Sequence, residues 1–160
     1  RSLEEWLPIA GSIEAIAKLS IAGYLIAIAT NQAGLAKGLF NEADLNAMHA
    51  KMIELVELSG GTITTIRYCP HHPNENCGCR KPRPGMLISI LEDLNVKPED
   101  SWFIGDNLKD IQAGERAGSK TALVKTGKGT ATLAKGEGLA NSQVFKDLFE
   151  FSEHILASDF

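Results

Sequence analysis

The chain has 160 residues, of which 44% are hydrophobic and 22% charged, and its formal net charge is −4. This length is sufficient for one domain with a hydrophobic core, and the composition is that of an ordinary globular protein. The negative net charge gives no general attraction to nucleic acid or to anionic membranes, and the longest apolar run, Tyr24 to Ala29, is too short to span a bilayer. We therefore expect a single domain over 1–160 with neither a nucleic-acid nor a membrane partner.

Helix-like and strand-like segments alternate along the chain. Apolar residues at helical spacing, bounded by glycine or capping residues, predict helices at 11–22, 41–58, 85–95, 108–117 and 144–156. Short apolar or β-branched runs predict strands at 24–30, 62–68, 101–105 and 120–124, with the Gly-, Lys- and Thr-rich stretch 126–142 as loop. The alternation predicts an α/β fold, doubly wound, with a mostly parallel sheet and helices on both faces.

The three cysteines of the chain are clustered with two of its four histidines in the segment from Cys69 to Cys79. Three thiols and an imidazole form the ligand set of a closed, tetrahedral Cys3His zinc site, which leaves no open position for catalysis. Buried structural thiols are the alternative, but these cysteines are flanked by polar residues, Pro and Gly. An odd number of cysteines also fits a disulfide framework poorly. The pattern therefore predicts a structural zinc loop, with His71 and His72 as the candidates for the fourth ligand.

Polar side chains follow three of the predicted strands. Thr30, Asn31 and Gln32 follow the first, Arg80 and Lys81 follow the second and the cysteine loop, and a third group follows the strand at 101–105. That third group consists of Asp106, Asn107 and Asp110. Ligands of doubly wound folds bind at the carboxyl ends of the strands. A hydroxyl, an amide, a lysine and a carboxylate there can hold a phosphoryl group and Mg²⁺.

Four segments together resemble the haloacid-dehalogenase superfamily, and within it the D-glycero-D-manno-heptose 1,7-bisphosphate phosphatases and the related histidinol-phosphate phosphatases. The segments are Thr30-Asn-Gln-Ala-Gly-Leu-Ala-Lys-Gly38, Cys69-Pro-His-His-Pro73, Cys77-Gly-Cys-Arg-Lys-Pro-Arg-Pro-Gly85 and Ile104-Gly-Asp-Asn-Leu-Lys-Asp110. The resemblance extends from about Trp6 to Gly129, and the cysteine loop joined to Arg-Lys-Pro is its most specific part. It implies hydrolysis of the C7 phosphate through an aspartyl-phosphate, in the synthesis of ADP-/GDP-heptose and lipopolysaccharide core precursors.

The resemblance also implies a role for each matching residue. Thr30 and Lys81 would be catalytic, and Asp106 would bind Mg²⁺. The implied substrate contacts are Asn31, Gln32, Ala33, Arg80 and Asn107, and the implied zinc ligands are Cys69, His71, Cys77 and Cys79. Ala33 stands where the family often has serine, so one side-chain hydroxyl is lost there. The expected ligands are thus Mg²⁺, Zn²⁺ and a small phosphorylated sugar, for a protein that we expect to be monomeric.

The sequence departs from the family in one respect. The family's nucleophile and general acid lie in an Asp-x-Asp motif on a first, central strand, and residues 1–160 contain no Asp-x-Asp. Arg1 is not a natural start residue, so we expect an N-terminally truncated chain that is inactive alone. No leader for secretion opens the chain, and clustered thiols suit a reducing compartment, so we expect a cytoplasmic protein.

Two other functions fit the same residues. One is hydrolysis of histidinol phosphate by the same chemistry. The other is a catalytically dead, zinc-stabilised module that binds phosphosugars. A strand ending in Asp-x-Asp upstream of Arg1 would favour the enzyme, whereas a true start near Arg1 would favour the binding module.

Overall fold

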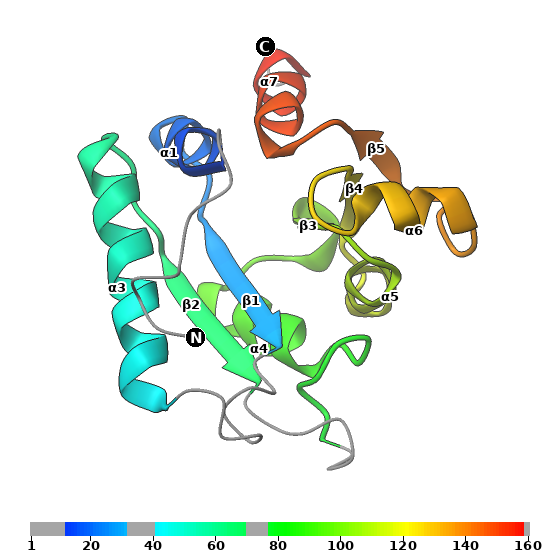
Figure 1. Cartoon of the computed structure of the whole chain (residues 1–160), viewed down its shortest axis with the longest axis horizontal. Coiled ribbons are helices and arrows are strands. Elements are labelled where there is room, and N and C mark those ends of the chain that lie inside the picture. Colours follow the sequence, from blue (N-terminus) through cyan, green and yellow to red (C-terminus); the bar gives the residue numbers. More distant parts are fainter. Residues whose placement is uncertain (1–11, 32–40, 70–76, 159–160) are drawn as a thin grey trace. The chain divides into compact units, whose positions relative to one another are not determined.

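The computed structural model describes residues 12–31, 41–69 and 77–158. The chain forms two compact units, the first from Arg1–Glu75 with Phe149–Phe160 and the second from Asn76–Leu148. Each unit contains a separate parallel sheet, with the order β1-β2 in the first unit and β3-β4-β5 in the second (Figure 1). The parallel α/β architecture predicted from the sequence is confirmed, since every strand pair within 12–31, 41–69 and 77–158 is parallel.

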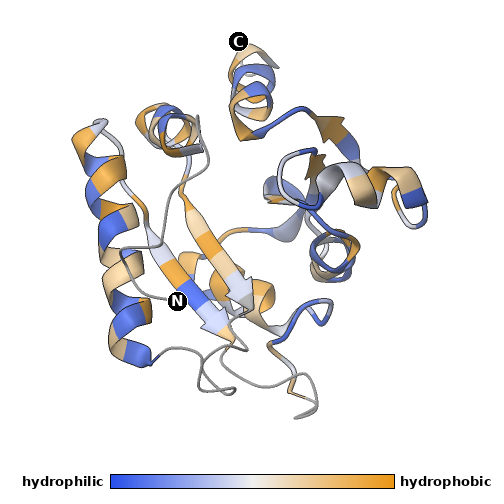
Figure 2. Ribbon diagram, viewed as in Figure 1, coloured by the Kyte–Doolittle hydropathy of each residue, from blue (hydrophilic) through white to orange (hydrophobic). Residues whose placement is uncertain are grey.

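Among the residues that the structure describes, the first unit contains two strands and the helices next to them in the chain. Its elements in chain order are α1 (Ser12–Ile21), β1 (Ala27–Asn31), α3 (Glu42–Leu58), β2 (Thr65–Cys69) and nearly all of α7 (Leu148–Ser158). The register pairs Ala27 with Thr65 and Asn31 with Cys69, so both strands end side by side at their carboxyl ends. Figure 2 shows hydrophobic and hydrophilic residues alternating along α3, as expected of a helix with one buried side.

Local chemistry fixes where α3 begins. The Asn41 side chain accepts a hydrogen bond from the Asp44 N–H at 2.8 Å, and the Asp44 carboxylate accepts one from the Asn41 N–H at 3.2 Å. This reciprocal capping box provides acceptors for two backbone N–H groups that have no acceptor within the helix. After α3, Gly61 allows close packing on α1, because a Cβ there would lie 2.6 Å from the Ala17 Cα. The predicted helix start and glycine break are therefore confirmed.

A small aromatic group links α3 to β2. The Tyr68 hydroxyl donates to Glu42 Oε1 at 3.1 Å, and the His49 ring lies 5.9 Å from the Tyr68 ring, centroid to centroid. Partial burial lowers the pKa of the His49 imidazole. Burial, together with the Glu42 carboxylate that holds the hydroxyl proton and repels a phenolate, raises the pKa of Tyr68.

The second unit contains the remaining strands. Its elements are α4 (Gly85–Leu94), a 3-10 turn η3 (Pro98–Asp100), β3 (Trp102–Gly105), α5 (Leu108–Ala117), β4 (Lys120–Val124), α6 (Gly129–Lys135) and β5 (Gln143–Phe145). Helix α5 packs on β3 and β4. Gly114 makes this close packing possible, since a Cβ there would lie 2.7 Å from Thr121 Cγ2. Ile111 and Leu123 are completely buried in this unit.

Two expectations for the C-terminal part of the chain are wrong. The stretch expected to be loop contains α6, which ends at Gly136 in the left-handed conformation (φ 71°). The helix expected from 144 begins only at Leu148, because Gln143–Phe145 instead form β5 beside β4. Pairing with a strand distant in sequence outweighs the helical spacing there, and it buries Phe145.

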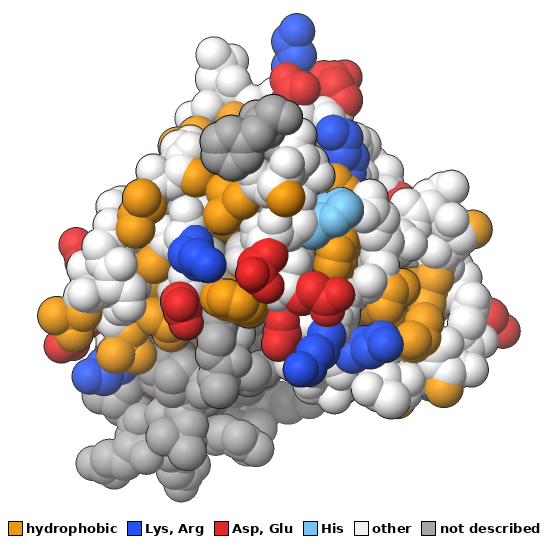
Figure 3. Space-filling model, turned by 90° about the horizontal axis from the view of Figure 1, so that it is seen from above, with side chains coloured by type: hydrophobic (Ala, Val, Ile, Leu, Met, Phe, Trp, Pro, Cys, Tyr) orange, Lys and Arg blue, Asp and Glu red, His pale blue; other side chains and the backbone are white. Residues whose placement is uncertain are grey.

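Among the described residues, the longest apolar helices all fall short of what is needed to cross a membrane. Acidic and basic side chains lie interspersed with hydrophobic ones on the face drawn in Figure 3.

Candidate active site

A buried ion pair lies at the carboxyl end of β3. Lys81 Nζ donates to Asp110 Oδ1 at 2.7 Å, and the two side chains are only 12% and 8% exposed. Lys81 Nζ also lies 5.6 Å from the centre of the Phe103 ring, within the range of a cation–π contact. The ammonium is thus held in one place by a carboxylate and an aromatic ring, although its own residue lies on a loop.

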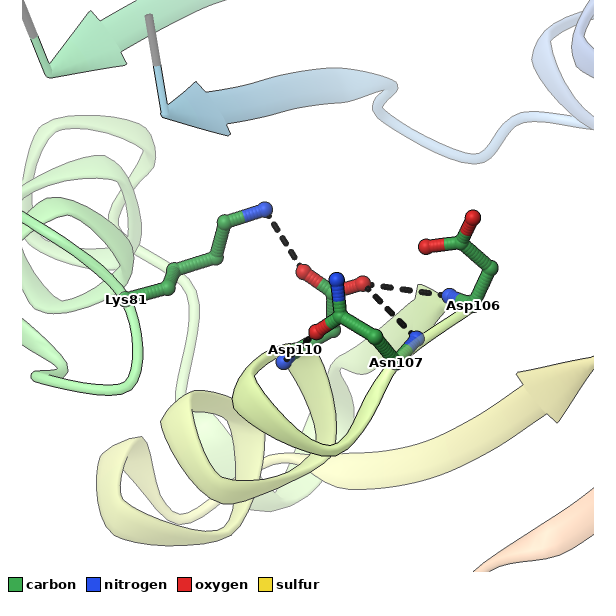
Figure 4. Close-up of polar contacts among 4 residues, drawn as sticks. All are labelled: Lys81, Asp106, Asn107 and Asp110. Carbon is green, nitrogen blue, oxygen red and sulfur yellow. Dashed lines mark hydrogen bonds and ion pairs between the residues drawn. The ribbon is translucent and has the colours of Figure 1, made fainter. Parts of the chain in front are cut away.

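Asp110 connects this pair to the end of β3. Its second oxygen, Oδ2, accepts hydrogen bonds from the N–H groups of Asp106 at 3.1 Å and Asn107 at 3.3 Å (Figure 4). Gly105 is required for this approach, because a Cβ there would lie 2.2 Å from the Asp110 Cβ. Asp110 therefore accepts three donors, and it orients both the lysine and the turn that carries Asp106.

The sequence prediction placed Asp110 in the strand-end group but gave it no role in the site. The signal was present in the spacing Asn107-x-x-Asp110. This spacing forms a capping box for α5, in which the Asn107 side chain accepts from the Asp110 N–H at 3.1 Å. Asn107 was predicted as a substrate contact, and its carboxamide oxygen caps the helix.

Asp106 presents a carboxylate at the end of β3. Its Oδ2 accepts the Lys128 N–H at 3.0 Å. Among the described residues, no hydrogen-bond donor contacts the other oxygen, Oδ1. Figure 4 shows the Asp106 carboxylate near the Lys81–Asp110 pair, with no contact drawn between the two carboxylates. A fixed carboxylate with one oxygen available is a suitable donor for a hard divalent cation such as Mg²⁺.

The loop that carries Arg80 and Lys81 is closed on itself. The Gly85 N–H donates to the Gly78 carbonyl at 3.1 Å, and the Arg83 N–H donates to the Arg80 carbonyl at 2.9 Å. The Arg83 guanidinium also donates to the Cys77 carbonyl. These hydrogen bonds hold the segment that carries the two cations in a closed turn.

Arg80 has one guanidinium nitrogen in an unusual state. Its Nη1 atom is buried and has no hydrogen-bond partner in the part of the chain that the structure describes. A buried donor without a partner costs about 1–3 kcal/mol, and more when the group is charged. Such a donor is well suited to an anionic ligand that completes its hydrogen bonds.

Two of the predicted zinc ligands lie close together in the second unit. The sulfur atoms of Cys77 and Cys79 are 3.6 Å apart. Two thiolates at about 2.3 Å from a tetrahedral zinc ion would be separated by about 3.8 Å, so this pair fits such a site. Cys69 is a third cysteine that could offer a sulfur ligand, and it is completely buried at the end of β2 in the first unit.

Thr30 and Asn31 are the last two residues of β1, where they pair with Tyr68 and Cys69. Their predicted position at a strand end is confirmed. Gln32, Ala33, His71 and His72 lie outside the described residues.

The chain is similar to known proteins over nearly its whole length. The family model of HAD-hydrolase-like proteins matches residues 78–151. A D-glycero-beta-D-manno-heptose-1,7-bisphosphate 7-phosphatase of Neisseria meningitidis is 46% identical over 158 residues, which cover 98% of this chain and 84% of the relative. The corresponding phosphatase of Pseudomonas aeruginosa is 50% identical over 135 residues, covering 84% and 76%.

Solved structures give the same result. The D,D-heptose 1,7-bisphosphate phosphatase of B. bronchiseptica, complexed with magnesium and phosphate, superimposes with a TM-score of 0.95 and 42% identity, covering 98% of this chain and 88% of that one. The enzyme from Burkholderia thailandensis gives a TM-score of 0.77 and 38% identity, with coverage of 96% and 89%. The chain therefore belongs to the haloacid-dehalogenase-like hydrolases and, within them, to the D-glycero-D-manno-heptose 1,7-bisphosphate 7-phosphatase family.

Proposed function

We propose that this protein is a Mg²⁺-dependent phosphatase that removes the C7 phosphate of D-glycero-D-manno-heptose 1,7-bisphosphate. The observation that carries the proposal is the Lys81–Asp110 pair beside the Asp106 carboxylate at the end of β3. Relatives that share 42–50% of this sequence over most of its length are phosphatases for this sugar. The alternative is the same reaction on histidinol phosphate. Comparing the hydrolysis rates of the two substrates distinguishes between them.

Each residue of the described site has a use in phosphoryl transfer. Lys81 would offset the charge of the transferring phosphoryl group, and Asp110 would keep the ammonium oriented toward it. Asp106 would hold Mg²⁺, which supplies electrostatic stabilisation of the phosphoryl oxygens. Arg80 would contact the anionic substrate, which is supported by its buried Nη1, for which the described residues supply no partner. The Asp-x-Asp nucleophile would come from outside residues 1–160, because these contain no such motif.

The remaining contacts are proposed from the resemblance alone. We assign Thr30 to stabilising the phosphoryl group, and Asn31, Gln32, Ala33 and Asn107 to contacts with the substrate. We also infer that the protein acts as a monomer in the cytoplasm. Size-exclusion chromatography with light scattering tests the oligomeric state.

The test measures phosphate release by the protein supplied with a strand that ends in Asp-x-Asp. We expect Mg²⁺-dependent hydrolysis of the heptose bisphosphate, with histidinol phosphate a much poorer substrate. Lys81→Ala should lower kcat about 100- to 1000-fold, the usual effect of removing one charge-stabilising group. Lys109→Ala, which removes an exposed lysine of α5, is the matched control and should retain full activity.

Loss of the Lys81 ammonium leaves Asp110 buried without its cation, so the variant could unfold for that reason alone. The double variant Lys81→Met with Asp110→Asn removes both charges while keeping the side-chain volumes. If this folded double variant kept near-parental kcat, the placement of Lys81 in the active site would be wrong. Faster hydrolysis of histidinol phosphate would instead transfer the assignment to the alternative substrate.

We further propose a structural zinc ion held by Cys69, His71, Cys77 and Cys79. The spacing of the cysteines and the 3.6 Å between the sulfur atoms of Cys77 and Cys79 support it. About one zinc per chain is expected by elemental analysis, since four ligands complete a tetrahedral site. His71→Ala should lose zinc, whereas His72→Ala should retain it. Zinc-free protein in which two of the three thiols have formed a disulfide would contradict the proposal.

A further inference from the structure

The backbone that follows β4 contacts Asp106 in two places. The Lys128 N–H donates to Asp106 Oδ2 at 3.0 Å. The hydroxyl of Thr132, one turn further along in α6, lies 3.0 Å from the Asp106 carbonyl and 3.0 Å from the Lys128 carbonyl, and it shares its one proton between them. The segment after β4 therefore holds both the side chain and the backbone of Asp106, which lies at the end of β3.

Gly127 is the residue that permits this contact. It adopts a φ of +56°, and a Cβ built on it would lie 2.3 Å from Asp106 Oδ2. A side chain at this position would therefore collide with the carboxylate oxygen that the neighbouring N–H holds. Glycine at this position therefore has two effects: it allows the turn to form, and it lets the Asp106 carboxylate approach the backbone.

We propose that Gly127 is a positioning residue for the metal site, acting together with the Lys128 N–H and the Thr132 hydroxyl. By holding Oδ2 against the backbone, these groups fix the rotation of the Asp106 carboxylate and leave Oδ1 to bind the cation. The inference rests on the proposed role of Asp106 as the Mg²⁺ ligand. It gives a function to the segment after β4, which contains none of the predicted site residues.

A glycine with positive φ is also needed simply to form a turn, so the test must separate the two effects. Gly136 provides the matched control, because it has a φ of +71° at the end of α6 and the nearest atom to its Cβ would be the Leu133 carbonyl oxygen at 3.9 Å. Alanine at either glycine meets an unfavourable positive φ. Only alanine at Gly127 meets the Asp106 carboxylate.

The first measurement is binding of Mn²⁺, used as a paramagnetic substitute for Mg²⁺, by electron paramagnetic resonance. Gly127→Ala and Thr132→Val should each raise the dissociation constant about tenfold or more. Gly136→Ala should stay within about twofold of the parent, and Thr132→Ser should rescue binding because it retains the hydroxyl. Circular dichroism verifies that each variant is folded.

The second measurement does not require a metal. The Lys128 amide proton, followed in ¹⁵N–¹H spectra, should shift upfield in Asp106→Asn and in Gly127→Ala as its hydrogen bond weakens, and should not move in Gly136→Ala. Mn²⁺ binding by folded Gly127→Ala within twofold of the parent would overturn the inference. Absence of Mn²⁺ binding in the parent, with the amide signature intact, would instead overturn the proposed metal role of Asp106 and leave the contact standing.

Discussion

Replacing Asp110 with asparagine should destabilise the protein strongly although the two side chains have nearly the same shape. Asp110 faces three donors: the Lys81 ammonium at 2.7 Å on Oδ1, and the Asp106 and Asn107 N–H groups at 3.1 and 3.3 Å on Oδ2. Asparagine has one acceptor oxygen and one NH2 group. Whichever way it is turned, its NH2 group meets a donor.

The size of the effect follows from burial. The two charged side chains are 12% and 8% exposed, so solvent screens their interaction only weakly. Removing one partner of a buried pair costs about 3–5 kcal/mol. Because asparagine keeps one oxygen, we expect the lower end, a loss of about 3 kcal/mol in the free energy of unfolding. For a chain of this length that corresponds to a fall in Tm of about 6–12 °C.

Urea denaturation followed by circular dichroism measures the change. The control is Lys51→Ala, which removes the exposed pair between Lys51 and Glu54, whose charged atoms are 3.9 Å apart and whose side chains are 43% and 60% exposed. That loss should be below about 1 kcal/mol. A double-mutant cycle with Lys81→Met should give a coupling energy above about 1 kcal/mol. If Asp110→Asn cost no more than Lys51→Ala, the pair would not be the buried interaction that the geometry indicates.

Three further outcomes are expected, all measured as free energies of unfolding. Burial lowers the pKa of His49, so as the pH falls below about 6.5 the imidazole is protonated in the unfolded chain before it is protonated in the folded one, and the free energy of unfolding should decrease. His49→Phe should make the free energy of unfolding less dependent on pH in this range. An unchanged pH dependence would contradict the role of His49. Gly61→Ala should cost about 1–3 kcal/mol through collision with the α1 backbone. Gly78→Ala, whose Cβ would meet no described atom within 4 Å, should cost less than about 1 kcal/mol; equal losses would be inconsistent with the close packing at Gly61. Leu45→Ala should cost about 2–5 kcal/mol because Leu45 is completely buried, and Leu58→Ala, at a side chain that is 76% exposed, should cost less than about 0.5 kcal/mol; similar values would place Leu45 outside the core.

Much of the fold could be predicted because its signals are local. The α5 helix was predicted at the bounds that it has, since Asn107 and Gly118 form its two caps from neighbouring residues. The strand β3 ends where its apolar run ends, and β1 ends two residues after its own run, which is why Thr30 and Asp106 were correctly expected at strand ends. The family could also be identified from sequence, because motifs such as Cys77-Gly-Cys-Arg-Lys-Pro carry specific side chains at fixed spacing.

Other features depend on residues far apart in sequence, and only the tertiary structure decided them. Gln143–Phe145 form a strand because β4 offers an edge to pair with, although their own spacing favours a helix. Lys81 and Asp110 are 29 residues apart, and Asp106 and Lys128 are 22 apart. Their contacts are formed only when the loop, the sheet and α5 are packed together. The sequence by itself therefore determined which chemical groups the site would contain, whereas the packing determined which oxygen of each carboxylate is engaged, because hydrogen-bond partners are chosen by proximity in space.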